Sequence, residues 1–167
     1  MKKIIAATLL SAAMLTTTVV AENIKMGVIL GFTGPIESLT PTMAGSAEMA
    51  FKEASDSGKL LNGSTIEVVR ADSTCIDAAA ATSAAERLIT SDRVAGIMGA
   101  DCSGVTTAIA NNVAIPNGVT IISPSATSPA LTTIEDKGFF FRTAPSDARQ
   151  GLLLAEVVRD RGIKKLA

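Results

Sequence analysis

The sequence contains no histidine, no tryptophan and no tyrosine, and its only aromatic residues are five phenylalanines. Without histidine, the chain lacks the commonest general base and the commonest metal ligand of proteins. Without tryptophan and tyrosine, a binding site made from this chain lacks the usual aromatic walls. Charged residues make up only 19% of the 167 positions and the net charge is −1, so no basic surface points to a nucleic-acid partner.

The first 21 residues have the pattern of a secretory signal peptide. Lys2 and Lys3 precede an apolar run over residues 4–15, and Val19-Val20-Ala21 places small residues at the two positions that a signal peptidase reads. A transmembrane anchor would need about 20 apolar residues, and this run is shorter. We therefore expect export, with residues 1–21 removed as a signal peptide.

Cys75 and Cys102 are the only cysteines of the chain. In an exported protein they enter an oxidising compartment, where a disulfide is the default state. By the chain-entropy model, a disulfide between these two positions stabilises the folded protein by about 3–4 kcal/mol. The alternative is a reactive thiolate at Cys102, which a helix N-terminus would favour.

Short apolar segments alternate with amphipathic or alanine-rich segments about every 20–30 residues. We predict strands over residues 24–30, 66–70, 94–98, 119–122 and 139–142, with helices after the first, second, third and fifth of them. This alternation is typical of an α/β fold with a doubly wound parallel sheet and helices on both faces. Ligands of such sheets lie beyond the carboxyl ends of the strands, where the loops over residues 32–35, 72–75, 99–103 and 123–129 would gather.

Ser103 lies where the third predicted strand ends and a helix begins. Free backbone N–H groups and the positive end of the helix dipole favour a carboxylate at such a place. The alternative is that Ser103 only caps the helix. No G-x-S-x-G or nucleotide-binding motif is present, and no histidine exists to activate Ser103. Asp72, Asp77 and Asp101 lack calcium-loop spacing and are more typical of caps, so we expect no metal and no cofactor.

Four sequence features in register resemble one protein family. They are the segment Ile-Lys-Met-Gly-Val-Ile-Leu-Gly-Phe-Thr-Gly-Pro over residues 24–35, the two cysteines, Cys102-Ser103, and Ile-Ser-Pro-Ser-Ala-Thr-Ser-Pro over residues 122–129. Together they are similar to the periplasmic solute-binding proteins of branched-chain amino-acid and amide ABC transporters, which have the type I periplasmic binding fold. The resemblance covers residues 22–167.

The resemblance implies a two-lobed protein more than twice this long, with the ligand in the cleft between the lobes. Residues 22–143 would then form the N-terminal part of lobe 1, and residues 144–167 the hinge crossing and the start of a truncated lobe 2. The sequence is accordingly expected to be an N-terminal fragment.

The same resemblance implies a ligand-binding site. Ser103 would bond the ligand carboxylate through its hydroxyl, while Ser125, mainly through its backbone, and Thr127 would hold the α-carboxylate and α-ammonium groups. Thr33 and Leu39, from the loop after the first strand, are further candidates. Leu39 is the nearest counterpart of an aromatic residue in leucine-binding members.

The function expected from these features is a monomeric receptor, not an enzyme. It would capture an amino acid or amide and present this small-molecule solute to the membrane permease of an ABC transporter. One alternative is a ligand-sensing receptor or regulator domain of the same fold. The other, a secreted thiol hydrolase using Cys102, requires a free thiol.

Overall fold

The structure, a computed structural model, describes residues 21–165. It contains one parallel sheet of five strands in the order β2-β1-β3-β4-β5. The strands are β1 (Asn23–Leu30), β2 (Thr65–Asp72), β3 (Gly96–Gly99), β4 (Thr120–Ser123) and β5 (Phe140–Arg142). The helices are α1 (Thr40–Asp56), α2 (Ala78–Thr90), α3 (Ser103–Ile109) and α4 (Asp147–Asp160). The helix α3 continues as the π-helical turn η2 (Ala110–Ala114). The short 3-10 turns are η1 (Leu61–Gly63) and η3 (Pro129–Thr132). The expected doubly wound α/β fold is confirmed.

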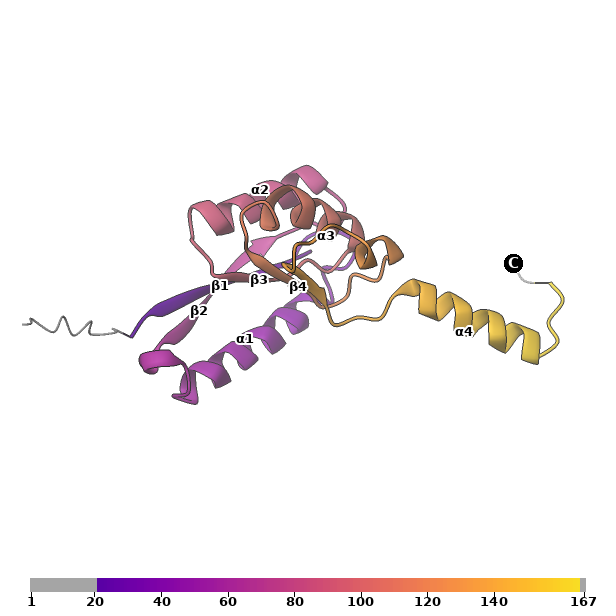
Figure 1. The fold of residues 1–167 in the computed structure, drawn as a ribbon, viewed down its shortest axis with the longest axis horizontal. Helices are drawn as coiled ribbons and strands as arrows, with labels where there is room; N and C mark the ends of the chain where they lie inside the picture. The colour runs from indigo at the N-terminus through magenta and orange to yellow at the C-terminus, as the bar shows by residue number, and fades with distance from the viewer. Residues whose placement is uncertain (1–20, 166–167) are drawn as a thin grey trace, which may run out of the picture.

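Helices cover both faces of the sheet, with α1 on one face and α2 and α3 on the other (Figure 1). Successive side chains of a strand point to opposite faces. In β1, Val28 and Leu30 therefore pack with Ala44 of α1, whereas Ile29 belongs to the larger core on the side of α2 and α3. Burial of these alternating apolar residues fixes β1 between two helical layers.

The helix α2 is positioned by a side-chain cap and by small residues. Asp77 Oδ1 accepts hydrogen bonds from the backbone N–H groups of Ala79 and Ala80, which confirms the predicted N-cap. The buried face of α2 carries Ala81, Ala85 and Leu88. Because two of these side chains are single methyl groups, the helix approaches the sheet closely.

The strand β3 begins two residues later than predicted. Val94 and Ala95 precede it, and the Val94 N–H donates to the Leu88 carbonyl at the end of α2 instead of entering the sheet. Val94 is nevertheless only 5% exposed, because it packs in the core. An apolar residue that is buried against a helix has the same sequence pattern as a residue in a short buried strand.

The loops that follow the strands meet at the carboxyl edge of the sheet, as expected for parallel strands. The chain leaves β1 for β2 on one side and later enters β3 on the other side, so β1 is the point where the winding reverses. Cys75 and Cys102 lie on the loops after β2 and β3, and β1 lies between these two strands.

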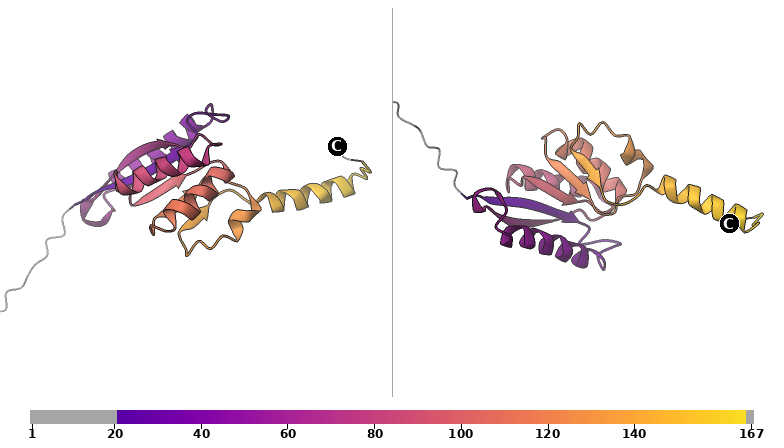
Figure 2. Two further views of the ribbon diagram at one scale, coloured as in Figure 1. Left: turned by 90° about the horizontal axis from the view of Figure 1, so that it is seen from above. Right: turned by 60° about the horizontal axis from the view of Figure 1, so that its bottom comes forward.

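The helix α4 leads away from the sheet and its covering helices (Figures 1 and 2). Ser146 Oγ accepts from the Ala148 N–H and caps this helix. None of its residues is buried, and Leu152, Leu153 and Leu154 are 44–62% exposed. Residues 164–165, which follow α4, belong to no helix or strand.

The predicted signal peptide falls almost entirely on residues 1–20, which lie outside the described residues. Within residues 21–165, no helix has the length and apolar character required to cross a membrane.

Candidate ligand-binding site

Cys75 and Cys102 form a disulfide that joins the loops after β2 and β3, with their Cα atoms 5.2 Å apart. The predicted bridge is confirmed. The interpretation of Cys102 as a reactive thiolate is wrong, because its sulfur is bonded. Gly31, in the loop after β1, lies close to the bridge, and a Cβ placed on it would be 3.2 Å from Cys75 Cβ.

Ser103 joins two loops and does not cap its own helix. Cys102 occupies the N-cap position of α3 without a side-chain hydrogen bond, so the capping interpretation is wrong. Ser103 Oγ instead accepts from the backbone N–H groups of Thr127 and Ser128, each at 3.1 Å. Its proton donates no hydrogen bond within residues 21–165. The hydroxyl therefore retains one donor for a further acceptor.

Ser125 and Thr127 lie in the loop after β4, and both hydroxyls are engaged. Ser125 Oγ donates to the Asp101 carbonyl at 3.0 Å. Thr127 Oγ1 donates to Asp147 Oδ2 at 2.9 Å, and the Asp147 N–H donates back to the Thr127 carbonyl at 2.9 Å. Since both protons are used, these hydroxyl oxygens are free to accept hydrogen bonds from a ligand.

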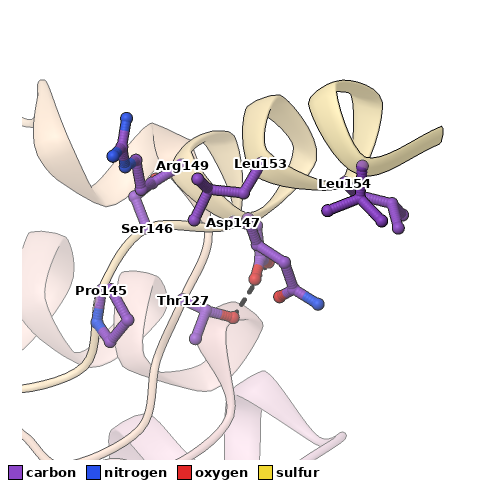
Figure 3. A pocket seen from close by; sticks show the side chains of 9 residues that line it. Thr127, Pro145, Ser146, Asp147, Arg149, Leu153 and Leu154 are labelled. Atoms are coloured by element: carbon purple, nitrogen blue, oxygen red, sulfur yellow. Dashed lines mark hydrogen bonds between the residues drawn. The ribbon is translucent and has the colours of Figure 1, made fainter. Parts of the chain in front are cut away.

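A cavity of about 520 Å³ lies between Thr127 and the first turns of α4 (Figure 3). Asp147, Arg149 and Gln150 line its polar part, while Leu153 and Leu154 are among its apolar lining residues. Neither Thr33 nor Leu39 lines this cavity. Of the candidate site residues, only Thr127 lines this cavity. Hydrogen bonds place Ser103 beside Thr127, and Ser125 binds the carbonyl of Asp101, two residues before Ser103.

Thr33 is held by the end of β2. Its Oγ1 donates to Asp72 Oδ2 at 2.6 Å, and the Thr74 N–H donates to Asp72 Oδ1 at 2.8 Å. Burial raises the pKa of the Asp72 carboxyl, but these hydrogen bonds together outweigh burial and lower the pKa below its ordinary value. Leu39 lies at the N-cap of α1 with 60% of its side chain exposed.

The loop after β1 also presents Phe32, whose ring lies 5.4 Å below the Arg70 guanidinium carbon. Arg70 donates to both carboxylate oxygens of Glu48 on α1. This hydrogen bonding lowers the pKa of Glu48 and raises the pKa of Arg70. Because the pair is largely exposed, its contribution to stability is small.

Three residues order these loops in a way that the sequence did not predict. Asp101 is buried between the loops, and Asp147 binds Thr127. Arg142 Nη1 donates to the carbonyls of Ala126 and Ser128 at 3.3 and 2.8 Å, and its Nη2 donates to Thr132 Oγ1 at 2.6 Å. The signal available for Asp101 is a single charged residue two positions after a buried strand. No group of three metal-ligating side chains occurs among the described residues.

The sequence matches the protein family described as periplasmic binding protein over residues 23–167. The chain belongs to this family. The resemblance inferred from the four sequence features is confirmed.

Relatives and solved structures of this family cover most of the chain. The chain is 30% identical over 141 residues to the leucine-, isoleucine-, valine-, threonine- and alanine-binding protein of Pseudomonas aeruginosa, covering 84% of this chain and 36% of that protein. A branched-chain amino-acid transporter substrate-binding protein of Streptococcus pneumoniae, solved with isoleucine, matches with a TM-score of 0.66 and 32% identity over 75% of this chain and 35% of that one.

A solute-binding protein of Rhodopseudomonas palustris, solved with 3,4-dihydroxybenzoic acid, matches with a TM-score of 0.72 and 25% identity. The alignment covers 85% of this chain and 37% of that one. The chain therefore spans little more than a third of the length of these periplasmic binding proteins. These proteins are named for the amino acids or solutes that they bind.

Proposed function

We propose that the protein is the periplasmic substrate-binding component of an ABC importer and captures an amino acid or a similar small zwitterionic or amide solute. Family membership supports the receptor role. The observation that carries the proposed site is the hydroxyl of Ser103, which accepts two backbone N–H groups and still has its proton to donate. Such a donor suits a ligand carboxylate.

The neighbouring hydroxyls complement the other end of a zwitterion. Ser125 and Thr127 donate their protons to protein oxygens, so their own oxygens accept from donors such as an ammonium group. Ser103 on one loop and Thr127 on the next would thus hold the carboxylate and the ammonium of one amino acid. This pairing requires no bond making, in agreement with a receptor that is not an enzyme.

The proposed mechanism is closure of two lobes around the solute, which shifts an open–closed equilibrium. Residues 22–143 would belong to lobe 1 and residues 144–167 to the crossing and the start of lobe 2. The exposed apolar side chains of α4 fit a helix that packs within a second lobe. In this proposal residues 1–21 direct export, and the monomeric closed form delivers its solute to a membrane permease.

The test is calorimetric titration of the full-length exported protein with leucine, isoleucine, valine, glutamate, a short amide and urea. We expect micromolar or tighter binding of one of these solutes. Ser103→Ala should weaken it by about 1.5–3 kcal/mol, the range for a hydrogen bond to a charged group. Ser103→Thr, which keeps a hydroxyl, should restore part of the affinity.

Ser83→Ala is the matched control, because Ser83 is exposed on α2 and lies outside the loops that carry the proposed site. Unchanged affinity in Ser103→Ala would remove the proposed site and leave the receptor role. Absence of binding across the whole panel would contradict the proposed substrate class.

A further inference from the structure

Asp101 contacts every loop that forms the candidate site. It follows β3 and is only 3% exposed. Its Oδ2 accepts from the Gly31 N–H at 2.8 Å, and its Oδ1 accepts from the Cys102 N–H at 2.9 Å and from Ser73 Oγ at 3.3 Å. Its carbonyl accepts from Ser125 Oγ at 3.0 Å. One buried residue therefore joins the loops after β1, β2 and β4 to its own loop.

A buried carboxylate is costly unless donors or a cation compensate its charge. Among residues 21–165, no lysine or arginine forms an ion pair with Asp101. The compensation comes instead from the two backbone N–H groups and the Ser73 hydroxyl. An apolar residue here would leave the Gly31 and Cys102 N–H groups without their acceptor, so the carboxylate satisfies backbone donors from two different loops.

We propose that Asp101 is a positioning residue for solute binding, whose carboxylate and carbonyl fix the loops that present Ser103 and Ser125 to the ligand. This inference rests on the function proposed above. Asp101 does not itself contact the solute. It acts through the residues that do.

The first connection runs through Cys102. Asp101 Oδ1 holds the Cys102 N–H, and the next residue is Ser103, whose Oγ accepts from Thr127 and Ser128. The Asp101 carbonyl holds the Ser125 hydroxyl. The loop over residues 125–128 is thus fixed at one end by Asp101 and at the other end by Ser103.

The second connection runs through Gly31. Its N–H is held by Asp101 Oδ2, while its carbonyl accepts from Thr40 Oγ1 at 3.1 Å, at the first residue of α1. A Cβ on Gly31 would lie 3.5 Å from Asp101 Oδ2, in van der Waals contact with it. The carboxylate therefore fixes the start of α1 relative to the loop that carries Ser103.

The two carboxylate oxygens explain why an amide cannot replace Asp101. Asparagine has one oxygen acceptor and one NH2 donor group. In either orientation its NH2 would face a backbone N–H, that of Gly31 or that of Cys102. Asp101→Asn therefore breaks one of the two connections without leaving a cavity.

The experiment compares Asp101→Asn with wild type in the full-length protein, at a temperature well below unfolding. We expect at least a tenfold loss of affinity for the solute that the wild type binds best in the panel above. Without solute, amide hydrogen exchange measured by NMR should become at least tenfold faster at Gly31 or Cys102, and also at Thr127 and Ser128.

Two further variants separate positioning from general stability. Ser73→Ala removes only the longest of the three carboxylate bonds, and we expect a two- to fivefold loss of affinity. Val113→Ala truncates a fully buried side chain of η2, so it lowers stability. Because Val113 lies outside the loops, we expect its affinity to stay within twofold of wild type.

The inference is overturned if Asp101→Asn keeps affinity and exchange within twofold of wild type, or if Val113→Ala loses as much affinity as Asp101→Asn. If Asp101→Asn does not fold, Ser73→Ala is used for the test instead. A loss of solute affinity in Ser73→Ala that is no greater than the loss in Val113→Ala then overturns the inference. A wild type that binds no panel solute refutes the proposed substrate class, whereas the exchange pattern still tests the alignment of the loops.

Discussion

The Thr127 N–H donates to Ser103 Oγ at 3.1 Å across 24 positions of sequence. This bond connects the loop after β3 to the loop after β4 on adjacent strands of the sheet. A serine that begins a helix normally uses its hydroxyl to satisfy that helix. Here the hydroxyl serves a neighbouring loop, so the same residue that would bind a ligand also sets the geometry of its partner loop.

Reduction of the disulfide between Cys75 and Cys102 should destabilise the protein. Removing the cross-link enlarges the conformational freedom of the unfolded chain, and we expect a loss of about 3–4 kcal/mol in the free energy of unfolding. Urea denaturation with and without reductant measures it. Alkylation of the unreduced protein should label neither cysteine.

The double variant Cys75→Ser, Cys102→Ser provides the control for this prediction. Its stability should be low and insensitive to reductant. A wild-type stability that does not change on complete reduction would contradict the expected contribution of the bridge.

Gly99→Ala should be strongly destabilising. Gly99 ends β3 with a φ of +135°, and a Cβ there would lie 2.0 Å from the Ile29 carbonyl oxygen of the adjacent strand. The backbone conformation and the collision with β1 both oppose a side chain. We expect a loss of about 3 kcal/mol or more in the free energy of unfolding, measured by thermal or urea denaturation.

Gly45→Ala is the matched control for Gly99→Ala. Gly45 lies inside α1, and among the described residues no atom would come within 4 Å of its added Cβ. Alanine should stabilise the helix there by about 0.5–1 kcal/mol. Similar effects of the two substitutions would show that the environment of Gly99 is not as constrained as the structure indicates.

Acid should reduce the contribution of Asp72 to stability. The pKa of Asp72 is lowered in the folded protein, because hydrogen bonds from Thr33 and Thr74 outweigh burial. A carboxyl with a lowered pKa stabilises the folded state above its unfolded pKa, about 3.9, and loses that contribution as the pH falls through the folded pKa. The stabilisation is therefore fully present at neutral pH.

The variant Thr33→Val tests this pH dependence. At pH 7 it should lower the free energy of unfolding by about 1 kcal/mol or less, since the bond is exposed. The difference from wild type should shrink as the pH falls below about 4. Urea denaturation across pH measures it, and a difference that grows with acid would contradict the assignment.

Arg142→Lys should loosen the loop after β4. The guanidinium donates to the carbonyls of Ala126 and Ser128 and to Thr132 Oγ1, and a lysine ammonium keeps the charge but not this planar geometry. We expect a loss of about 1–3 kcal/mol in stability and faster amide exchange over residues 126–132. Arg149→Lys, at an exposed position of α4, should leave both quantities unchanged.

Local sequence determined the fold class of this protein. The apolar run of β1, the aspartate before the alanines of α2 and the serine before α4 act within a few residues, so strands, caps and their order could be predicted. The family resemblance also followed from sequence, because its four features are contiguous residue patterns. The pairing of Cys75 with Cys102 needed only the absence of any other cysteine and the expectation of export.

Tertiary structure decided what the polar residues do. Asp101 is surrounded by donors from Gly31 and Ser73, which lie 70 and 28 positions away. Ser103 meets Thr127, and Thr33 meets Asp72, only because the sheet places the ends of separate strands side by side. These contacts depend on strand order and on the point where the winding reverses, and no local pattern of residues encodes either of them.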